Sequence, residues 1–304
     1  MLPYIFIIRN LLHAGFYAIF AIMHYWMKRI IKRINEGLSS CYTAGEVTAL
    51  TRIIATELLG IPQMTFFLKD EVNLTAEQDA LLDNAIERLK KQEPIQYILG
   101  YSDFCGLRFK VTPATLIPRP ETSELVEWIA NEAIGNESIL DIGTGSGCIA
   151  VSLAHKLPQS KVTAWDISHE AIAVATENSK ANGCSVAFEQ LDILAYQPTG
   201  EQFDIIVSNP PYIKENEKEA MHSNVLDWEP HTALFVPDND PLLFYRIIAG
   251  KGLTILKPGG RLYFEINRAH GNETMEMLAS LGYTGIELRK DFADNDRMIR
   301  AVKN

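Results

Sequence analysis

"ILDIGTGSGCIAVSLA", residues 139–154, decides the fold class of this chain. A branched apolar run leads to Asp141, and glycines follow at Gly143, Gly145 and Gly147, where a helical pattern begins. Glycines at such a turn let backbone amides approach a ligand closely, and the N-terminus of the helix adds positive potential. The stretch therefore predicts a strand, a ligand-binding turn and a helix, which together form one unit of a parallel α/β sheet.

The pattern of strand, turn and helix continues along the rest of the chain. Predicted helices begin after Gly147, run from Ser168 as N-cap to Gly183, and occupy about 241–256. Such alternation requires crossover connections, which build a mostly parallel sheet with helices on both faces. No helical pattern separates the last two predicted strands, so we expect them to pair antiparallel. The predicted strands are 138–142, 162–166, 186–190, 203–208, 260–266, 283–289 and 297–302.

The region before the glycine loop divides into a helical part and a linker. "TAGE" at 43–46 and "TAEQ" at 75–78 match the capping-box pattern, in which the N-cap and N3 residues satisfy each other's amides. Two short alternating runs meet near Gly106 and predict a β-hairpin, and prolines then exclude regular structure until a helix near Thr122. The predicted organisation is an apolar extension at 1–26, a small helical domain at 27–92, a β-hairpin linker at 93–118 and an α/β domain at 119–304.

Residues 1–26 are strongly apolar, but Arg9, Asn10, His13 and His24 interrupt the run. Three interpretations compete for this extension: a membrane anchor, a helix packed on the fold, or an upstream extension of the reading frame. We favour the last, because the uninterrupted apolar run is shorter than the roughly 20 residues that a membrane span needs. Contact with a membrane is expected only if these residues are translated and inserted.

The overall composition limits the class of protein. The 304 residues are 47% hydrophobic and 22% charged, and the formal net charge is −10. This is an ordinary globular composition, and its acidic balance argues against an extended nucleic-acid footprint. The cysteines form no C-x-x-C pair and have no neighbouring histidine at metal spacing, so we expect reduced thiols, no metal site and a cytoplasmic protein. They are Cys41, Cys105, Cys148 and Cys184.

The spacing of the glycine loop distinguishes between nucleotide ligands. A dinucleotide fingerprint reads G-x-G-x-x-G, whereas Cys148 occupies its third glycine position here. Asp141 precedes the loop, where a carboxylate suits a cationic ammonium group better than a pyrophosphate. Asp166 ends the second predicted strand, placed to accept ribose hydroxyl hydrogens. This combination predicts S-adenosyl-L-methionine; the alternatives are a dinucleotide, or a tight turn with Asp166 capping the next helix.

"FDIIVSNPPYI", residues 203–213, ends a buried strand on an asparagine and two prolines. Pro210 excludes Asn209 from the helical region, and each proline ring fixes its own φ, so the loop is rigid before any ligand binds. A planar NH₂ group would fit here, with one hydrogen on the Asn209 side-chain oxygen and the other on the Pro210 carbonyl. Tyr212 would lie against its π face, and Pro211 adds no competing donor. The alternative is a loop terminator with a buried tyrosine.

Several of these stretches together resemble one enzyme family. They are "QYILGYSDFCGLRFKVTPATLIPRPETSELVE", "ILDIGTGSGCIAVSLA", "FDIIVSNPPYI", "EPHTAL" and "KPGGRLYFEI". The chain resembles the peptide chain release factor glutamine methyltransferases of the HemK/PrmC family, strongly over about 93–302 and more loosely over 27–92. The resemblance implies a Rossmann-like class I S-adenosylmethionine-dependent methyltransferase domain with a small N-terminal helical domain that recognises the substrate. The implied reaction is N5-methylation of the glutamine in the Gly-Gly-Gln motif of class 1 release factors, and the expected protein is a monomer.

The resemblance also implies roles for individual residues. Asn209, Pro210 and Tyr212 are the expected catalytic residues, and Pro211 joins them in binding the glutamine amide. Some relatives carry a tryptophan where this chain has Ile193. The residues expected to hold the cofactor are Gly143, Thr144, Gly145, Ser146, Gly147, Asp166, Asp192, Ile193 and Asn209.

Three other functions remain open at this point. DNA adenine-N6 methyltransferases use a similar Pro-Pro-Tyr loop, but they need a basic target-recognition region, and this chain is acidic. A sister group methylates a glutamine of a large-subunit ribosomal protein, and short motifs do not separate it from the release factor enzymes. A non-catalytic module that binds translation components is the third, and the intact Asn209 loop argues against it.

Overall fold

The computed structural model describes residues 29–63, 73–200 and 202–304 of the chain. They fall into two compact units, which divide between Leu99 and Gly100. The apolar extension at 1–26 and its three interpretations lie outside the described residues. Within the described ranges, no helix combines the length and the apolar character that crossing a membrane requires.

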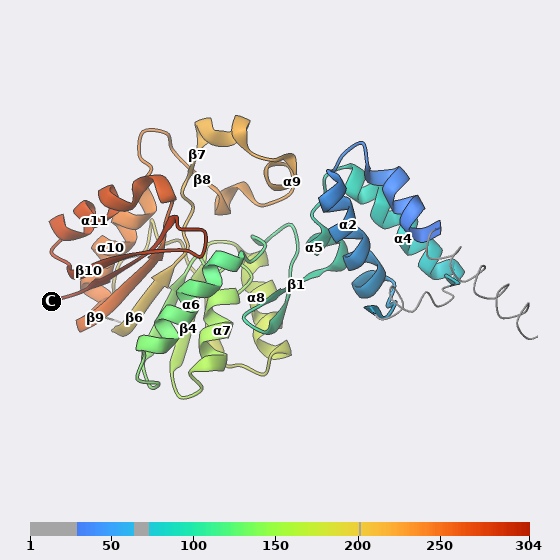
Figure 1. The fold of residues 1–304 in the computed structure, drawn as a ribbon. Helices are drawn as coiled ribbons and strands as arrows, with labels where there is room; N and C mark the ends of the chain where they lie inside the picture. Colours follow the sequence, from blue (N-terminus) through green and yellow to red (C-terminus); the bar gives the residue numbers. More distant parts are fainter. Residues whose placement is uncertain (1–28, 64–72, 201) are drawn as a thin grey trace, which may run out of the picture. The chain divides into compact units, whose positions relative to one another are not determined.

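The first unit is helical (Figure 1). Both predicted capping boxes are present. The Thr43 and Thr75 side chains each accept the N3 amide of the helix that follows, and the N3 side chain accepts the N-cap amide in return. Its core is built from apolar side chains at helical spacing, such as Ile34, Leu82 and Leu89, which are at most 1% exposed. The helices are residues 29–38, α2 (Ala44–Ile53), the π-helix η1 (Ile54–Leu58), α4 (Ala76–Lys90) and α5 (Ile95–Leu99).

The second unit begins with a β-hairpin formed by β1 (Tyr101–Phe104) and β2 (Leu107–Lys110). The turn needs two residues at positive φ, Cys105 at 49° and Gly106 at 77°. The side chain of Asn178 bonds to both backbone groups of Lys110, at 2.7 Å to its amide and 3.0 Å to its carbonyl, and so ties the hairpin to a helix of the sheet domain. Residues 111–118 have no helix or strand, as their prolines predicted.

A seven-stranded sheet forms the body of the second unit, in the order β10-β11-β9-β6-β3-β4-β5. β11 is antiparallel to both of its neighbours, and the remaining pairs are parallel. The predicted mostly parallel sheet with an antiparallel last strand is therefore confirmed. The strands are β3 (Ser138–Ile142), β4 (Lys161–Asp166), β5 (Val186–Gln190), β6 (Phe203–Ser208), β9 (Leu256–Glu265), β10 (Thr284–Lys290) and β11 (Asp296–Val302).

Helices cover both faces of this sheet (Figure 1). Alternate strand residues pack on opposite sides: Ile139 joins the core beneath α6 and α7, whereas Leu140 joins the core beneath α10 and α11. Helix α11 was not predicted from the sequence; it packs Met275 and Leu278 against the core of the sheet. The helices are α6 (Pro120–Glu132), α7 (Cys148–Lys156), α8 (His169–Ala181), α10 (Leu243–Ile255) and α11 (Gly271–Ser280).

Short elements that the sequence patterns did not predict follow the carboxyl end of β6. Strand β7 (Ile213–Lys214) pairs in parallel with β8 (Phe235–Val236). The chain between them folds over the edge of the sheet at which β3, β4 and β6 end, where open α/β sheets bind their ligands. It contains the 3-10 helices η2 (Glu215–Ala220) and η3 (His231–Ala233) and the helix α9 (Ser223–Leu226).

Candidate active site

The three glycines between β3 and α7 are required for two different reasons. All have positive φ, at 75° for Gly143, 55° for Gly145 and 81° for Gly147. A Cβ atom at Gly143 or Gly145 would meet no protein atom within 4 Å, whereas one at Gly147 would lie 3.0 Å from the Cβ of Ala175. The first two glycines thus keep the loop open to a ligand. The third lets α7 pack closely against α8.

Asp141 supports this loop from below. Its carboxylate is fully buried and accepts hydrogen bonds from the Thr144 hydroxyl at 2.6 Å and the Ala150 amide at 3.2 Å. Burial raises the pKa of Asp141 to about 7. Asp141 is not among the described residues that line the cavity above the loop, so its expected pairing with a ligand ammonium group stays a prediction.

Asp166, at the end of β4, faces the open side of the loop. One carboxylate oxygen accepts the Gly145 amide at 2.8 Å and the other accepts the Ser168 amide at 2.9 Å. Burial raises the pKa of Asp166, and the backbone hydrogen bonds oppose this rise. The Ser168 hydroxyl caps α8 by accepting the Ala171 amide at 3.1 Å, so Asp166 is not the cap of that helix. Each carboxylate oxygen retains acceptor capacity toward the cavity.

A cavity of about 350 Å³ lies above the loop; we call it the glycine-loop cavity. Of the residues expected to hold the cofactor, Gly143, Gly145 and Asp166 line it from β3 and β4, and Asp192 and Ile193 line it after β5. Asn209 completes this set at the end of β6. The other expected residues, Thr144, Ser146 and Gly147, belong to the loop but do not line the cavity.

Helix α10 contributes a wall of the glycine-loop cavity that the sequence patterns did not reveal. Phe244 and Ile248 line the cavity, although neither belongs to a recognisable motif. One turn further along, the Lys251 ammonium group donates to the carbonyls of Ile193 at 2.6 Å, Leu194 at 3.0 Å and Tyr196 at 2.5 Å. A single cation therefore holds the turn that carries Asp192 and Ile193.

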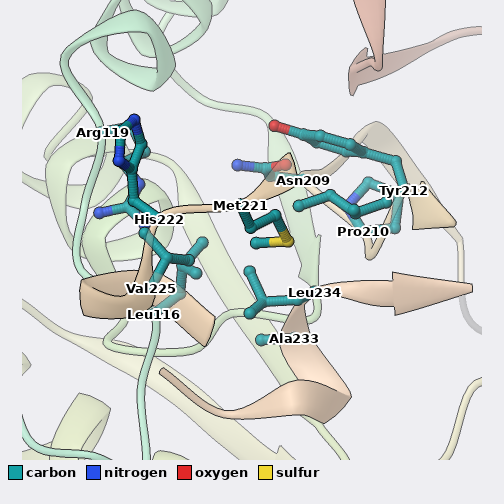
Figure 2. Close-up of a pocket in the computed structure, with 11 residues that line it drawn as sticks. Leu116, Arg119, Asn209, Pro210, Tyr212, Met221, His222, Val225, Ala233 and Leu234 are labelled. Carbon is teal, nitrogen blue, oxygen red and sulfur yellow. The ribbon is translucent and has the colours of Figure 1, made fainter. Parts of the chain in front are cut away.

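Residues 209–212 form a loop that we call the proline loop. A second cavity, of about 280 Å³, lies beside it, and we call this the Asn209 cavity. Figure 2 shows Asn209 and Pro210 on one side of it, with Val225 and Leu234 across from them. Its walls are largely apolar apart from the proline loop, Arg119 and His222. The two cavities share four lining residues, so they meet at the proline loop. The shared residues are Leu116, Asn209, Pro210 and Ala233.

The proline loop is held by hydrogen bonds from three directions. The Asn209 side-chain nitrogen lies 3.5 Å from the Thr122 hydroxyl, which leaves the Asn209 oxygen as the free end of the carboxamide. The Tyr212 hydroxyl donates to Glu265 at 3.4 Å, and the Asn267 side chain donates to the Tyr212 carbonyl at 3.1 Å. Burial raises the pKa of Tyr212, which is therefore a neutral phenol. Pro211 lines the glycine-loop cavity.

Glu229 joins the two segments that close both cavities. Its buried carboxylate accepts the Ile117 amide at 3.1 Å and pairs with the Arg119 guanidinium. Ile117 and Arg119 lie in the proline-rich segment before α6, and residues 230–234 follow Glu229 directly. Both segments line both cavities. The stretch "EPHTAL" thus borders both cavities, a position that its sequence alone did not reveal.

The arrangement suits transfer of a small group between two ligands. One ligand would lie over the glycine loop beside a carboxylate, and the other would present a donor to the Asn209 oxygen where the cavities meet. Among the described residues, no cluster of three or more histidines, cysteines or carboxylates is placed to hold a metal ion.

Two family models match the chain. The PrmC N-terminal domain matches residues 31–100, and the methyltransferase small domain matches residues 121–227. The second match contains the glycine loop, Asp166 and the proline loop.

Curated relatives are similar over most of their length. The release factor glutamine methyltransferase of Bacteroides thetaiotaomicron is 48% identical over 276 residues, which cover 90% of this chain and 99% of the relative. That of Flavobacterium psychrophilum is 45% identical over 270 residues, covering 87% and 95%. Among solved structures, a methyltransferase from Pyrococcus furiosus has a TM-score of 0.50 at 20% identity over 73% of this chain and 99% of that one, a likeness of fold.

Proposed function

Because the chain belongs to the release factor glutamine methyltransferase family, we propose that it methylates the glutamine side-chain amide in the Gly-Gly-Gln motif of class 1 peptide chain release factors, with S-adenosyl-L-methionine as methyl donor. The similarity to relatives of this name extends through both units of the chain. The observation that carries the proposal is the meeting of two cavities at Asn209 and Pro210.

The residues of the glycine-loop cavity fit the proposed cofactor. It supplies an activated methyl group on a positively charged sulfur. Gly143 and Gly145 leave room for close approach to the backbone, and the Asp166 carboxylate has lone pairs for ribose hydroxyls. Ile193 and the aromatic ring of Phe244 offer apolar surface for an adenine base. Among the described residues that line this cavity there is no lysine or arginine to pair with a diphosphate, which favours this cofactor over a dinucleotide.

The proline loop supplies alignment for the acceptor. A carboxamide nitrogen is a poor nucleophile because its lone pair is delocalised into the carbonyl. The Asn209 oxygen and the Pro210 carbonyl would each accept one amide hydrogen, and Tyr212 would cover the face of the amide. The apolar side chains of Val225 and Leu234 would surround the methylene groups of the glutamine. Such positioning contributes up to about 7–11 kcal/mol to catalysis.

We also propose that the protein is a monomer and that it acts in the cytoplasm, where release factors work. Both cavities lie within one unit of the chain and are lined by residues between positions 114 and 248.

Competing acceptors test the proposal. Purified protein and S-adenosylmethionine with a tritiated methyl group are incubated with release factor, ribosomes and DNA, each alone and in mixture. The expected result is label on the release factor, lost when its motif glutamine is replaced by alanine. Label on a large-subunit ribosomal protein or on DNA instead would assign the enzyme to another substrate class. Absence of label on every acceptor would favour a non-catalytic module that binds translation components.

A further inference from the structure

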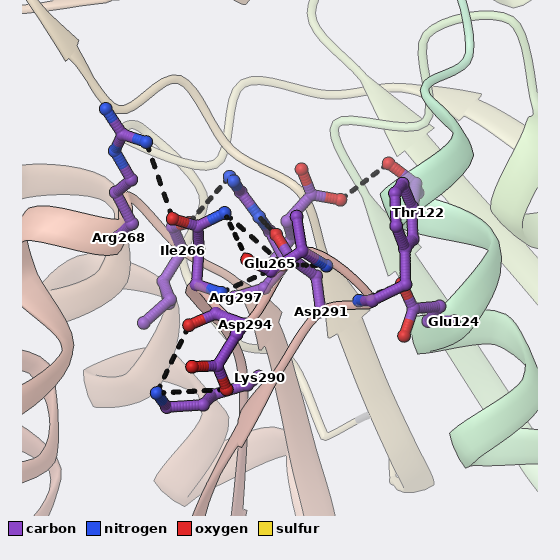
Figure 3. Close-up of polar contacts among 12 residues, drawn as sticks. Thr122, Glu124, Glu265, Ile266, Arg268, Lys290, Asp291, Asp294 and Arg297 are labelled. Atoms are coloured by element: carbon purple, nitrogen blue, oxygen red, sulfur yellow. Dashed lines mark hydrogen bonds and ion pairs between the residues drawn. The ribbon is translucent and has the colours of Figure 1, made fainter.

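A buried carboxylate lies beneath the proline loop. Glu265 ends β9, the strand that pairs with β6 just before Asn209, and its residue is 1% exposed. Its carboxylate accepts the Thr122 hydroxyl at 2.5 Å and the Tyr212 hydroxyl at 3.4 Å, and Figure 3 shows the Thr122 contact. Burying a charged group this deeply costs free energy unless the group is paired or hydrogen-bonded. Both of its hydrogen-bond donors contact or belong to the proline loop.

A cation near Glu265 offsets part of this cost. The cation is Arg297, on β11. Its Nε atom donates to the carboxylate of Asp291, in the turn between β10 and β11, at 3.0 Å (Figure 3). Burial raises the pKa of Glu265 and Glu121 adds to the rise, whereas the Thr122 hydrogen bond, the Arg297 charge and the Tyr212 hydroxyl oppose it. The carboxylate therefore has a donor, a counter-charge and a fixed position.

The hydrogen bonds have a defined direction. Thr122 donates its single hydroxyl hydrogen to the Glu265 carboxylate at 2.5 Å. The Thr122 oxygen can then only accept, and the group it faces at 3.5 Å is the side-chain nitrogen of Asn209. The Asn209 carboxamide is thereby turned with its NH₂ toward Thr122, which leaves its oxygen to accept from the amide of the proposed substrate.

We propose that Glu265, acting through Thr122, is a positioning residue that sets the orientation of the Asn209 carboxamide for methyl transfer. The proposal rests on the proposed function, in which the Asn209 oxygen accepts from the glutamine amide. In the reverse orientation, NH₂ groups of Asn209 and of the acceptor would face each other and no hydrogen bond would form between them. Thr122 and Glu265 touch neither ligand in this scheme. Their effect is to exclude the unproductive orientation.

Conservative variants at Thr122 test the proposal. Thr122→Val keeps the shape of the side chain but removes its hydroxyl. We expect kcat for release factor methylation to fall about 10- to 100-fold, somewhat less than the loss of a direct transition-state donor. The dissociation constant for S-adenosylmethionine, measured by calorimetry, should change less than about twofold, because neither residue lines the glycine-loop cavity. Thr122→Ser should restore kcat to within about threefold of wild type, since the hydroxyl returns.

Two controls separate orientation from general damage. Thr176→Val removes a hydroxyl that bonds to the Ile172 carbonyl at 2.7 Å on α8, away from the site, and should leave kcat unchanged. In an Asn209→Ala background, measured under single turnover with excess enzyme, Thr122→Val should cause no further loss. Equal losses in both backgrounds would mean that Thr122 acts independently of Asn209, and the proposal would fail.

The buried carboxylate itself gives a second test. Glu265→Gln preserves size, but its NH₂ can donate to Thr122 and free the hydroxyl to donate toward Asn209, which reverses the relay. Its kcat should fall by the same 10- to 100-fold, with cofactor affinity retained. Full activity in both Thr122→Val and Glu265→Gln, beside an active wild type, overturns this inference alone. A wild-type enzyme inactive on release factor would instead overturn the proposed function.

Discussion

In the function that we propose, the acceptor chemistry depends on Asn209, which lines both cavities. Asn209→Ala removes that acceptor without disturbing the backbone that the prolines hold. We expect the rate of methyl transfer, followed with tritiated cofactor, to fall at least about 10²- to 10³-fold, a typical loss for a group that stabilises the transition state. Cofactor affinity should remain within a few-fold of wild type.

Asn131→Ala is a matched control, since Asn131 is exposed on α6 outside both cavities. Its rate should equal that of the wild type. Unchanged turnover in Asn209→Ala would remove Asn209 from the mechanism.

Replacing Asp166 should weaken the binding of the cofactor. Asp166→Ala removes the carboxylate that lines the glycine-loop cavity and accepts the Gly145 amide. A hydrogen bond to a charged group contributes about 1.5–3 kcal/mol, so the dissociation constant for S-adenosylmethionine should rise about 10- to 100-fold in calorimetry. Asp103→Ala, an exposed carboxylate on β1, should leave it unchanged. If calorimetry shows no loss for Asp166→Ala, the assignment of Asp166 to the ribose is wrong.

Asp141 gives a prediction about pH and stability. Its folded-state pKa of about 7 is raised by burial, whereas an unfolded aspartate titrates near 3.9. Its contribution to the free energy of unfolding is therefore complete below about pH 4 and is lost as the pH rises through about 7. Asp141→Asn removes this titration, so wild type should lose up to about 1.4 kcal/mol more per pH unit than the variant within that window. Urea denaturation at pH 5, 6 and 7 measures the difference; parallel curves would contradict it.

At the scale of the elements, α10 both covers the sheet and fixes the turn after β5. Lys251 is the link, because its ammonium group holds three carbonyls of that turn. Lys251→Met keeps much of the aliphatic chain but leaves those carbonyls without their donor, so Asp192 and Ile193 lose their fixed position. We expect about a tenfold weaker affinity for S-adenosylmethionine, with kcat at saturating cofactor nearly unchanged.

Lys180→Met provides the matched control, since Lys180 is exposed on α8 and does not line the cavity. Calorimetry and the thermal shift that the cofactor induces should both separate the two variants. Equal affinity in Lys251→Met and wild type would show that the turn holds its shape without the lysine.

At the scale of the whole site, Glu229 should couple the two ligands. Its carboxylate joins residues 112 positions apart in the sequence, and the segments it joins line both cavities. Glu229→Gln keeps the size but removes the charge that pairs with Arg119. We expect about a three- to tenfold rise in both the cofactor dissociation constant and the KM for release factor, since each hydrogen bond to the charged group weakens.

Glu219→Gln, on an exposed side chain of η2, should change neither constant. A rise in only one of the two constants for Glu229→Gln would mean that the closing segments act separately on the two cavities.

Much of the fold followed from local patterns. The glycine loop, the Ser168 cap and the branched strands each depend on conformational preferences of neighbouring residues, and these were visible in the sequence. The antiparallel pairing of the last two strands followed from the absence of a helix between them. The insertion of β11 between β10 and β9 was not predicted, because the order of strands across a sheet depends on packing between distant segments.

The sequence by itself determined the elements to which we assign the chemistry, namely a glycine turn open to a ligand and an asparagine followed by two prolines. Backbone sterics of single residues dictate both. Only the tertiary structure decided what surrounds them. Thr122 and Glu265 meet across 143 positions, and Lys251 reaches carbonyls more than 50 positions away. Such contacts arise when strands and helices pack into one core, and no local preference encodes them.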